Sequence, residues 1–178
     1  MLIGLLVFNN DGLMSFLLYS ILHLTMVLGA FAFILVTKQC HQSANSADKK
    51  SLENLTSFAG LAKSAPLVAL AFACLLLSLA GIPPFAGFFA KFFVLAAAIK
   101  EGYNFLAFLA VISAVIACFY YLKIIKIMYF DCETEIFNKR ATFPVCAVLA
   151  VTSLFNFLFF LSPVSLISIV KIAADSIF

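Results

Sequence analysis

Charged residues are scarce in this sequence, and tryptophan is absent. Asp, Glu, Lys and Arg together make up 11% of the 178 residues, whereas 65% of the residues are hydrophobic. Soluble domains are about half apolar and about a quarter charged, so this composition excludes an ordinary soluble domain and indicates a polytopic membrane protein. The formal charge is only +3 and the basic residues are scattered, which excludes a role in nucleic-acid binding.

The sequence also lacks the motifs of redox and nucleotide chemistry. It contains no glycine-rich phosphate loop and no nucleophile elbow. The five cysteines show no close pairing of the kind that a zinc or redox site uses, and the adjacent Cys40 and His41 have no further ligand in range. We therefore expect no metal site, no redox active site and no binding site for NADH, flavin or an iron–sulfur cluster in this chain.

Long apolar segments predict an all-α, polytopic fold in a single transmembrane domain over residues 1–178. A helix needs about 20 apolar residues to cross a bilayer. About five segments approach this length, and residues 2–8 resemble the end of a further membrane helix. A polar loop is expected over 37–63, with an interfacial helix beginning in 51–60, and a charged loop over 131–140. The five predicted spans cover 13–36, 64–82, 84–99, 105–122 and 142–161.

Two adjacent prolines interrupt the apolar stretch from residue 64 to residue 99. Proline has no amide hydrogen and ends or bends a helix, and Gly81 precedes the pair Pro83-Pro84 closely. The whole stretch is too long for one crossing. We interpret Pro83-Pro84 as a reversal between two spans, the second of which contains Gly87.

Lys91 lies deep inside this apolar stretch. A lysine at the centre of a bilayer costs roughly 3 kcal/mol or more, so it is a functional residue by default. Lys91 follows Pro83 by eight residues, about 12 Å along a helix, and a lysine side chain reaches only about half that distance toward the interface. Gly87, one turn earlier, leaves room for water beside the amine. Burial disfavours the charged form of an amine, so we predict reversible proton transfer at Lys91. The alternative is a lysine held by backbone carbonyls that only joins helices.

His23 is the second candidate for proton transfer. It forms a polar stripe with Ser15 and Tyr19 at helical spacing, near the centre of the first span. An imidazole titrates near neutral pH and can pass a proton onward. Alternatively, a neutral His23 hydrogen-bonds Tyr19 or a neighbouring helix. Thr152 and Asn156 form another polar pair at i, i+4, a pattern that most often serves helix packing.

The segment from Ser78 to Phe92 carries a resemblance to a known family. Its order of Gly81, Pro83-Pro84, Gly87 and Lys91 resembles the signature of the antiporter-like membrane subunits of respiratory complex I, the NADH-quinone oxidoreductase. Phe92 makes it most similar to the subunit N group, because the cation/proton antiporter relatives commonly have an acid after the lysine. The runs 28–31 and 166–170 add support.

The resemblance implies an antiporter-like fold with a discontinuous helix near Pro83-Pro84, and it assigns Lys91 to the proton path toward the exit side. Only the C-terminal part of the family is covered. The implied partners are the N-terminal half of the same subunit, other complex I membrane subunits and the lipid bilayer. NADH, FMN, iron–sulfur clusters and quinone are expected in other subunits. The implied location is the bacterial plasma membrane or the mitochondrial inner membrane. The family usually has a tyrosine where this sequence has His23.

The leading hypothesis is a proton-translocating piece of the membrane arm of NADH-quinone oxidoreductase. It would couple quinone reduction elsewhere in the complex to proton transfer through Lys91. Two alternatives stand beside it: a membrane subunit of a cation/proton antiporter, and a membrane scaffold that does not transport. The family's glutamate–lysine pair and central lysine have no counterpart here, so the resemblance implies that the chain does not translocate protons unaided.

Overall fold

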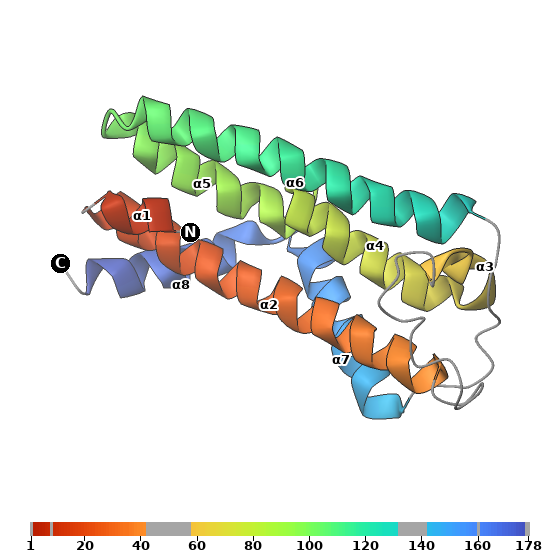
Figure 1. Ribbon diagram of the computed structural model, residues 1–178. Helices are drawn as coiled ribbons and strands as arrows, with labels where there is room; N and C mark the ends of the chain where they lie inside the picture. The colour runs from red at the N-terminus through yellow and green to blue at the C-terminus, as the bar shows by residue number, and fades with distance from the viewer. Residues whose placement is uncertain (1, 8, 42–57, 132–141, 160, 177–178) are drawn as a thin grey trace.

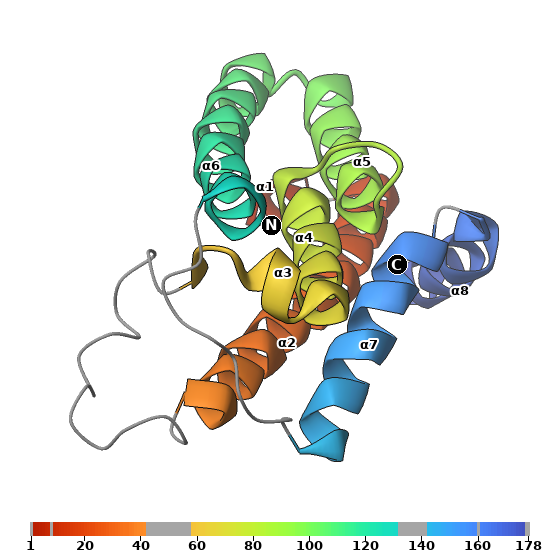
Figure 2. The ribbon, with the colours of Figure 1, turned by 90° about the vertical axis from the view of Figure 1, so that its right-hand side faces the viewer.

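The described part of the chain is entirely helical. A computed structural model describes residues 2–7, 9–41, 58–131, 142–159 and 161–176 (Figures 1 and 2). These residues contain no strand, which confirms the predicted all-α class. The helices are α1 (Leu2–Leu6), α2 (Asn10–His41), α3 (Leu61–Ser64), α4 (Pro66–Ala80), α5 (Ala86–Lys100), α6 (Asn104–Phe130), α7 (Phe143–Leu158) and α8 (Pro163–Asp175).

Helix α2 is the axis around which α1, α4, α5, α7 and α8 pack. Its C-terminal half packs against α4 and α7, where the rings of Phe33 and Phe72 stack with centroids 3.6 Å apart. Its N-terminal half packs against α5 and α8 through Leu18 and Leu22, which are fully buried. Two of the hydrophobic core clusters therefore lie one after the other along the same long helix.

Helices α4 and α5 follow each other along α2 in the same direction. Helix α4 lies beside the C-terminal half of α2, and α5 lies beside its N-terminal half. At the far end, the Lys100 Nζ atom is 2.7 Å from the Asp11 carboxylate at the start of α2. Helix α6 runs alongside both α4 and α5 (Figure 1). The chain thus passes through the break without folding back.

The predicted reversal at Pro83-Pro84 is therefore wrong. The prolines do end one helix, but the short segment between Ala80 and Ala86 only displaces the path sideways before it continues. Each of α4 and α5 has 15 residues, about 22 Å of helix, which is less than the roughly 30 Å of a bilayer core. The predicted spans 64–82 and 84–99 are two halves of one discontinuous path.

The remaining predictions of helices have mixed outcomes. Helices α2 and α6 contain the predicted spans 13–36 and 105–122 and are each long and apolar enough to cross a membrane. Helices α7 and α8 meet at a bend of 91°, where Pro163 begins α8, and together qualify as a third span. Among the described residues the count is thus two or three, so about five spans are not confirmed. Residues 42–57 and 132–141, which hold most of the two predicted loops, lie outside the described residues.

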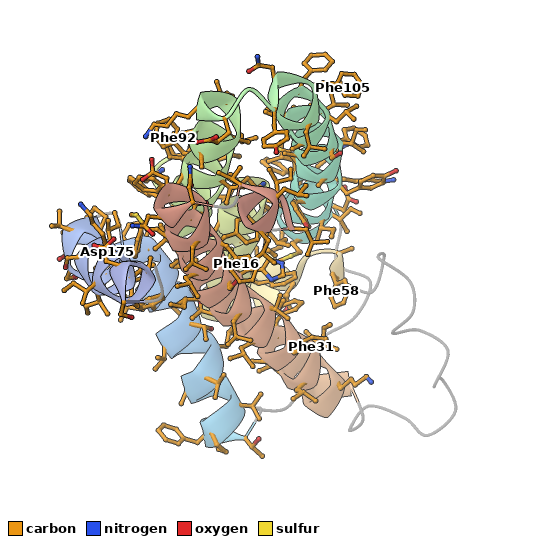
Figure 3. The ribbon with its side chains drawn as sticks, turned by 90° about the vertical axis from the view of Figure 1, so that its left-hand side faces the viewer. Phe16, Phe31, Phe58, Phe92, Phe105 and Asp175 are labelled. Carbon is orange, nitrogen blue, oxygen red and sulfur yellow. The ribbon has the colours of Figure 1, made fainter. Side chains whose placement is uncertain are left out.

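The outer surface is strongly apolar. Figure 3 shows Phe31, Phe92 and Phe105 on the outside of the bundle, and their exposed fractions are 62%, 54% and 74%. Apolar patches that extend along whole helices mark contact with a membrane or with other proteins. This surface fits an integral membrane protein.

Gly87 sets how closely α5 approaches α4. A Cβ atom built on Gly87 would overlap the Ser78 carbonyl oxygen, which is backbone and cannot rotate away. The side-by-side contact at the break therefore requires a residue without a side chain.

We predict that Gly87→Ala destabilises the protein by about 3 kcal/mol or more, because α5 must move away from α4. The measurement is the free energy of unfolding in detergent micelles. Gly102→Ala is the control: its Cβ atom meets nothing within 4 Å, although its φ of 82° strains an alanine. That strain costs about 1 kcal/mol. Equal losses in the two variants would contradict the role of crowding at Gly87.

Candidate functional site

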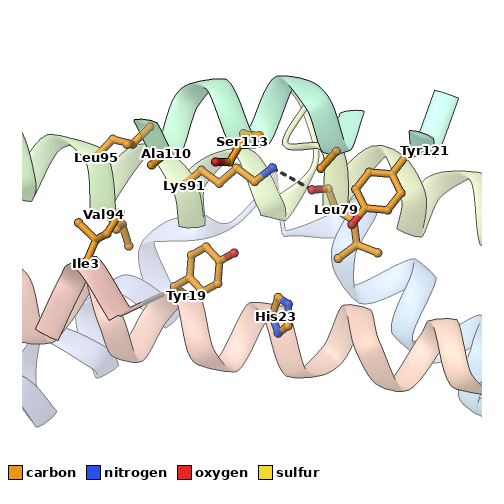
Figure 4. A pocket seen from close by; sticks show the side chains of 12 residues that line it. Ile3, Tyr19, His23, Leu79, Lys91, Val94, Leu95, Ala110, Ser113 and Tyr121 are labelled. Carbon is orange, nitrogen blue, oxygen red and sulfur yellow. Dashed lines mark hydrogen bonds between the residues drawn. The ribbon is translucent and has the colours of Figure 1, made fainter. Parts of the chain in front are cut away.

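The Lys91 amine reaches from α5 to the end of α4. Its Nζ atom donates a hydrogen bond to the Leu79 carbonyl at 2.9 Å (Figure 4) and another to the Ala80 carbonyl at 2.7 Å. The side chain is partly buried and forms no ion pair among the described residues. Lys91 thus lies inside the bundle beside the break, bound by backbone oxygens.

The Lys91 contacts complete the hydrogen bonding of the α4 C-terminus. The last four carbonyls of any α-helix have no partner within the helix. In α4, the Leu77 carbonyl accepts from the Gly81 and Ile82 amides, and the Ser78 carbonyl accepts from the Gly81 amide. The Leu79 and Ala80 carbonyls, which remain, are the two that accept from Lys91. All four carbonyls therefore have donors.

Gly81 makes this arrangement possible in two ways. Its φ of 83° is a left-handed conformation that glycine adopts at helix ends without strain. A Cβ atom there would also lie 2.8 Å from the Lys91 Cδ atom and 3.0 Å from Nζ. Any side chain at residue 81 would push the amine off its two carbonyls.

Ser78 accepts a third hydrogen bond across the break, in which α4 supplies the side chain and α5 supplies the backbone amide. Its side chain is fully buried, and its Oγ atom accepts a hydrogen bond of 3.0 Å from the Gly87 amide in the first turn of α5. The first amides of a helix lack partners just as the last carbonyls do. Helix α4 therefore caps α5 through Ser78, and α5 caps α4 through Lys91.

A cavity of about 300 Å³ adjoins the amine, between α2, α5 and α6 (Figure 4). It is partly open to the outside of the described residues. Its polar lining residues are Tyr19, His23, Lys91, Ser113 and Tyr121. Since a water molecule occupies about 30 Å³ in the liquid, this space accommodates several waters beside Lys91.

His23 lies on the wall of this cavity and not at the amine itself. Its ring stacks on Tyr19 with centroids 5.7 Å apart, and both side chains project from α2 toward α5 and α6. Among the described residues, His23 forms no hydrogen bond with Lys91 or Tyr19. Ser15, the third member of the predicted stripe, is buried and bonds the Gly12 carbonyl of its own helix.

Sequence reasoning did not find the cavity residues of α6. From its sequence position Tyr121 is predicted to be an interfacial aromatic residue, and the residues around Ser113 form no motif that marks it. A signal was present, because small residues recur at helical spacing on one face: Ala110, Ser113, Ala114 and Ala117. The described residues contain no group of three or more His, Cys, Asp or Glu side chains that could hold a metal ion.

Comparison with known proteins places this geometry in a family. A family profile described as "NADH:quinone oxidoreductase/Mrp antiporter, TM" matches residues 1–117, about two thirds of the chain. The chain belongs to this family. Its helix break and partly buried lysine lie within the matched residues.

The curated relatives agree on one subunit type. Proteins named NADH-quinone oxidoreductase subunit N from Azorhizobium caulinodans and Methylobacterium nodulans are 42% and 39% identical to this family member over 177 residues. These matches cover 99% of this chain but only 35% of each relative. The chain thus spans about a third of the length of the relatives that it matches.

Two solved structures share the fold. A chain of the Mrp complex from Dietzia superimposes with a TM-score of 0.77 at 22% identity, covering 97% of this chain and 39% of that one. A chain of respiratory complex I from Thermus thermophilus gives a TM-score of 0.56 at 28% identity, covering 63% of this chain and 26% of that one. The Mrp structure shows the fold alone.

We predict that water reaches the cavity beside Lys91. In a background without natural cysteines, Ser113→Cys should react with a small, charged thiol reagent, because thiolates form in water and not in lipid. Ile112→Cys is the matched control, since residue 112 is 41% exposed on the same helix but does not line the cavity. Labelling rates measured by mass spectrometry test this. Equal labelling of both variants would contradict a hydrated cavity.

Proposed function

We propose that this chain forms part of the membrane arm of an NADH-quinone oxidoreductase, as a piece of its subunit N, and that Lys91 carries protons there. The relatives named subunit N support the assembly, and the two carbonyl bonds of the Lys91 amine beside a polar cavity support the role of the lysine.

The hydrogen-bond inventory of an amine explains how Lys91 exchanges a proton without moving. A charged ammonium has three N–H donors, and a neutral amine has two donors and one lone pair. Two donors are engaged by the Leu79 and Ala80 carbonyls in either state. The third position holds a proton in the charged state and a lone pair in the neutral state. Proton exchange therefore leaves both hydrogen bonds to the C-terminal carbonyls of α4 intact.

Two opposing effects keep both protonation states of Lys91 accessible. The carbonyl end of a helix carries a partial negative charge, which favours the cation. Desolvation favours the neutral amine. The protonation equilibrium of Lys91 also responds to a further charge nearby. The electrostatic energy of such a charge is comparable to the effect of the helix end or of desolvation. Quinone reduction elsewhere in the complex supplies that charge movement through neighbouring membrane segments.

Water in the cavity provides the path to and from the amine. The cavity of about 300 Å³ has room for on the order of ten waters. Tyr19, His23 and Tyr121 line it with groups that donate or accept hydrogen bonds. His23 serves as an exchange group at this wall, because one nitrogen of a neutral imidazole donates a hydrogen bond and the other accepts one.

The wider setting follows from the same assignment. NADH, FMN, the iron–sulfur clusters and quinone are bound by other subunits, and the partners of this chain are the rest of subunit N, other membrane subunits and lipid. The membrane is the bacterial plasma membrane or the mitochondrial inner membrane.

In the assembled oxidoreductase, Lys91→Met should abolish most of the proton translocation per NADH oxidised, because methionine fills the same space but carries no proton. Lys63→Met, at an exposed lysine of α3, should have no effect. The measurement is the pH change outside inverted membrane vesicles during NADH oxidation. Unchanged pumping with normal assembly would favour the scaffold hypothesis.

We further expect that the purified chain, reconstituted alone into liposomes with an imposed pH gradient, conducts no protons above the background of empty liposomes. The site reaches a cavity on one side, but the described residues provide no second relay. A pH-sensitive dye inside the liposomes reports the flux. Proton flux that Lys91→Ala removes would contradict this expectation.

A cation/proton antiporter subunit is the second candidate, because the description of the matching family names the Mrp antiporter beside the oxidoreductase. Affinity purification from native membranes decides between the two. Redox subunits in the purified complex indicate the oxidoreductase, whereas their absence together with sodium-dependent proton exchange indicates the antiporter.

A further inference from the structure

Asn156 on α7 lies at the centre of a buried polar network behind the break. Its side chain is fully buried, and its Oδ1 atom accepts a hydrogen bond of 3.1 Å from the Ser78 hydroxyl. Its Nδ2 atom donates to the Thr152 carbonyl at 2.8 Å and to the Thr25 Oγ1 atom at 3.4 Å. One amide thus contacts both α4 and α2.

The Gly87 amide extends this network into a directed chain across four helices. Its N–H donates to Ser78 Oγ, the Ser78 hydroxyl donates to Asn156, and Asn156 donates to Thr25. The Thr25 hydroxyl ends the chain on the Leu22 carbonyl. Each hydroxyl donates once and accepts once, so the donor direction of every bond is fixed by its neighbours.

We propose that Asn156 is a positioning residue for Lys91, which acts by orienting the Ser78 hydroxyl and so fixing the offset between α4 and α5. This inference rests on the proposed proton transfer at Lys91. Asn156 does not contact the amine, so it is not a catalytic residue.

The distances explain why the offset matters. Ser78 immediately precedes Leu79 and Ala80, whose carbonyls bind the amine, and Gly87 lies one turn before Lys91. A slip of about 1 Å between the helices would stretch bonds of 2.7 and 2.9 Å beyond the usual hydrogen-bond limit. Without Asn156, the Ser78 hydroxyl can turn to a carbonyl of its own helix, as buried serines commonly do. The Gly87 amide then loses its fixed acceptor.

Solvent has little room to replace the hydrogen bond between the Gly87 amide and the Ser78 Oγ atom. A second cavity, of about 10 Å³, lies between Ser78, Gly87 and Lys91. That volume is at the lower limit for a single water. After a slip, water therefore has little room to bridge Ser78 and Gly87 on this side of the break, whereas the amine itself also adjoins the larger cavity.

The test uses the assembled oxidoreductase in native membranes. Asn156→Leu and Ser78→Ala each break the chain of bonds. Thr152→Val is the matched control, one turn away on α7, because within the described part of the chain the Thr152 hydroxyl donates only to carbonyls of its own helix. We measure the amount of assembled complex, the protons translocated per NADH oxidised, and the pH profile of translocation. The groups that face Lys91 and share in this profile are Tyr19 and His23 from α2 and Cys118 and Tyr121 from α6.

Asn156→Leu and Ser78→Ala should lower translocation per assembled complex roughly two- to tenfold, the factor expected for one lost hydrogen bond. Both should also change the pH profile, and Thr152→Val should change neither quantity. In a Lys91→Met background, Asn156→Leu should have no further effect on translocation, because the group that it positions is absent.

Three results would overturn the inference. If Asn156→Leu lowers only the amount of assembled complex, its role is packing. If Lys91→Met abolishes translocation but both network variants translocate normally, the inference fails and the proposed function stands. If Lys91→Met alone has no effect, both fail together. Where Asn156→Leu prevents assembly, Ser78→Ala, which removes a single hydroxyl, decides the outcome.

Discussion

A helix interrupted at membrane depth exposes polar backbone groups in a place where lipid cannot satisfy them. Such a break is tolerated only where the freed amides and carbonyls find partners inside the protein. In this chain the partners come from the two halves themselves: Lys91 of α5 binds the last carbonyls of α4, and Ser78 of α4 binds the first turn of α5. The close contact at Gly87, the left-handed Gly81 and the long companion helix α2 all serve this exchange. The hydrogen bonds of the candidate site are therefore also the bonds that stabilise the helix break.

The sequence identified the lysine of the candidate site, but it did not predict the geometry around that lysine. Lys91 was predictable because a charge in an apolar stretch needs a reason to be there, and the alternative that backbone carbonyls hold it describes its contacts correctly. The direction of the chain after Pro83-Pro84 was not predictable in the same way. Prolines predict where a helix ends, but they do not predict the direction of the next helix. That direction depends on α2 and α6, which run beside both α4 and α5. It also depends on Gly87, which allows α5 to contact α4 closely.

The cavity and the polar network could not be predicted from local sequence patterns, for a related reason. Helical periodicity identifies which residues share a face, so Thr152 and Asn156 were recognisable as a pair. It does not identify what that face meets. Asn156 meets Ser78, a residue 78 positions away, and Tyr121 meets the space in front of His23. The span count is not confirmed for the same reason, because two helices of 15 residues resemble two short spans until their end-to-end arrangement is known.

The identity of the residue at position 91 follows from the hydrogen bonds that it must make. Under the proposed proton transfer, the two carbonyls require two donors in both protonation states of residue 91. A glutamate in its charged form has no donor, and a neutral histidine has only one, so each would leave a carbonyl unpaired. Arginine has enough donors but does not release its proton in proteins. Lysine alone keeps two donors after it has given up a proton. A residue that both completes the fold and changes charge at this break is therefore restricted to lysine.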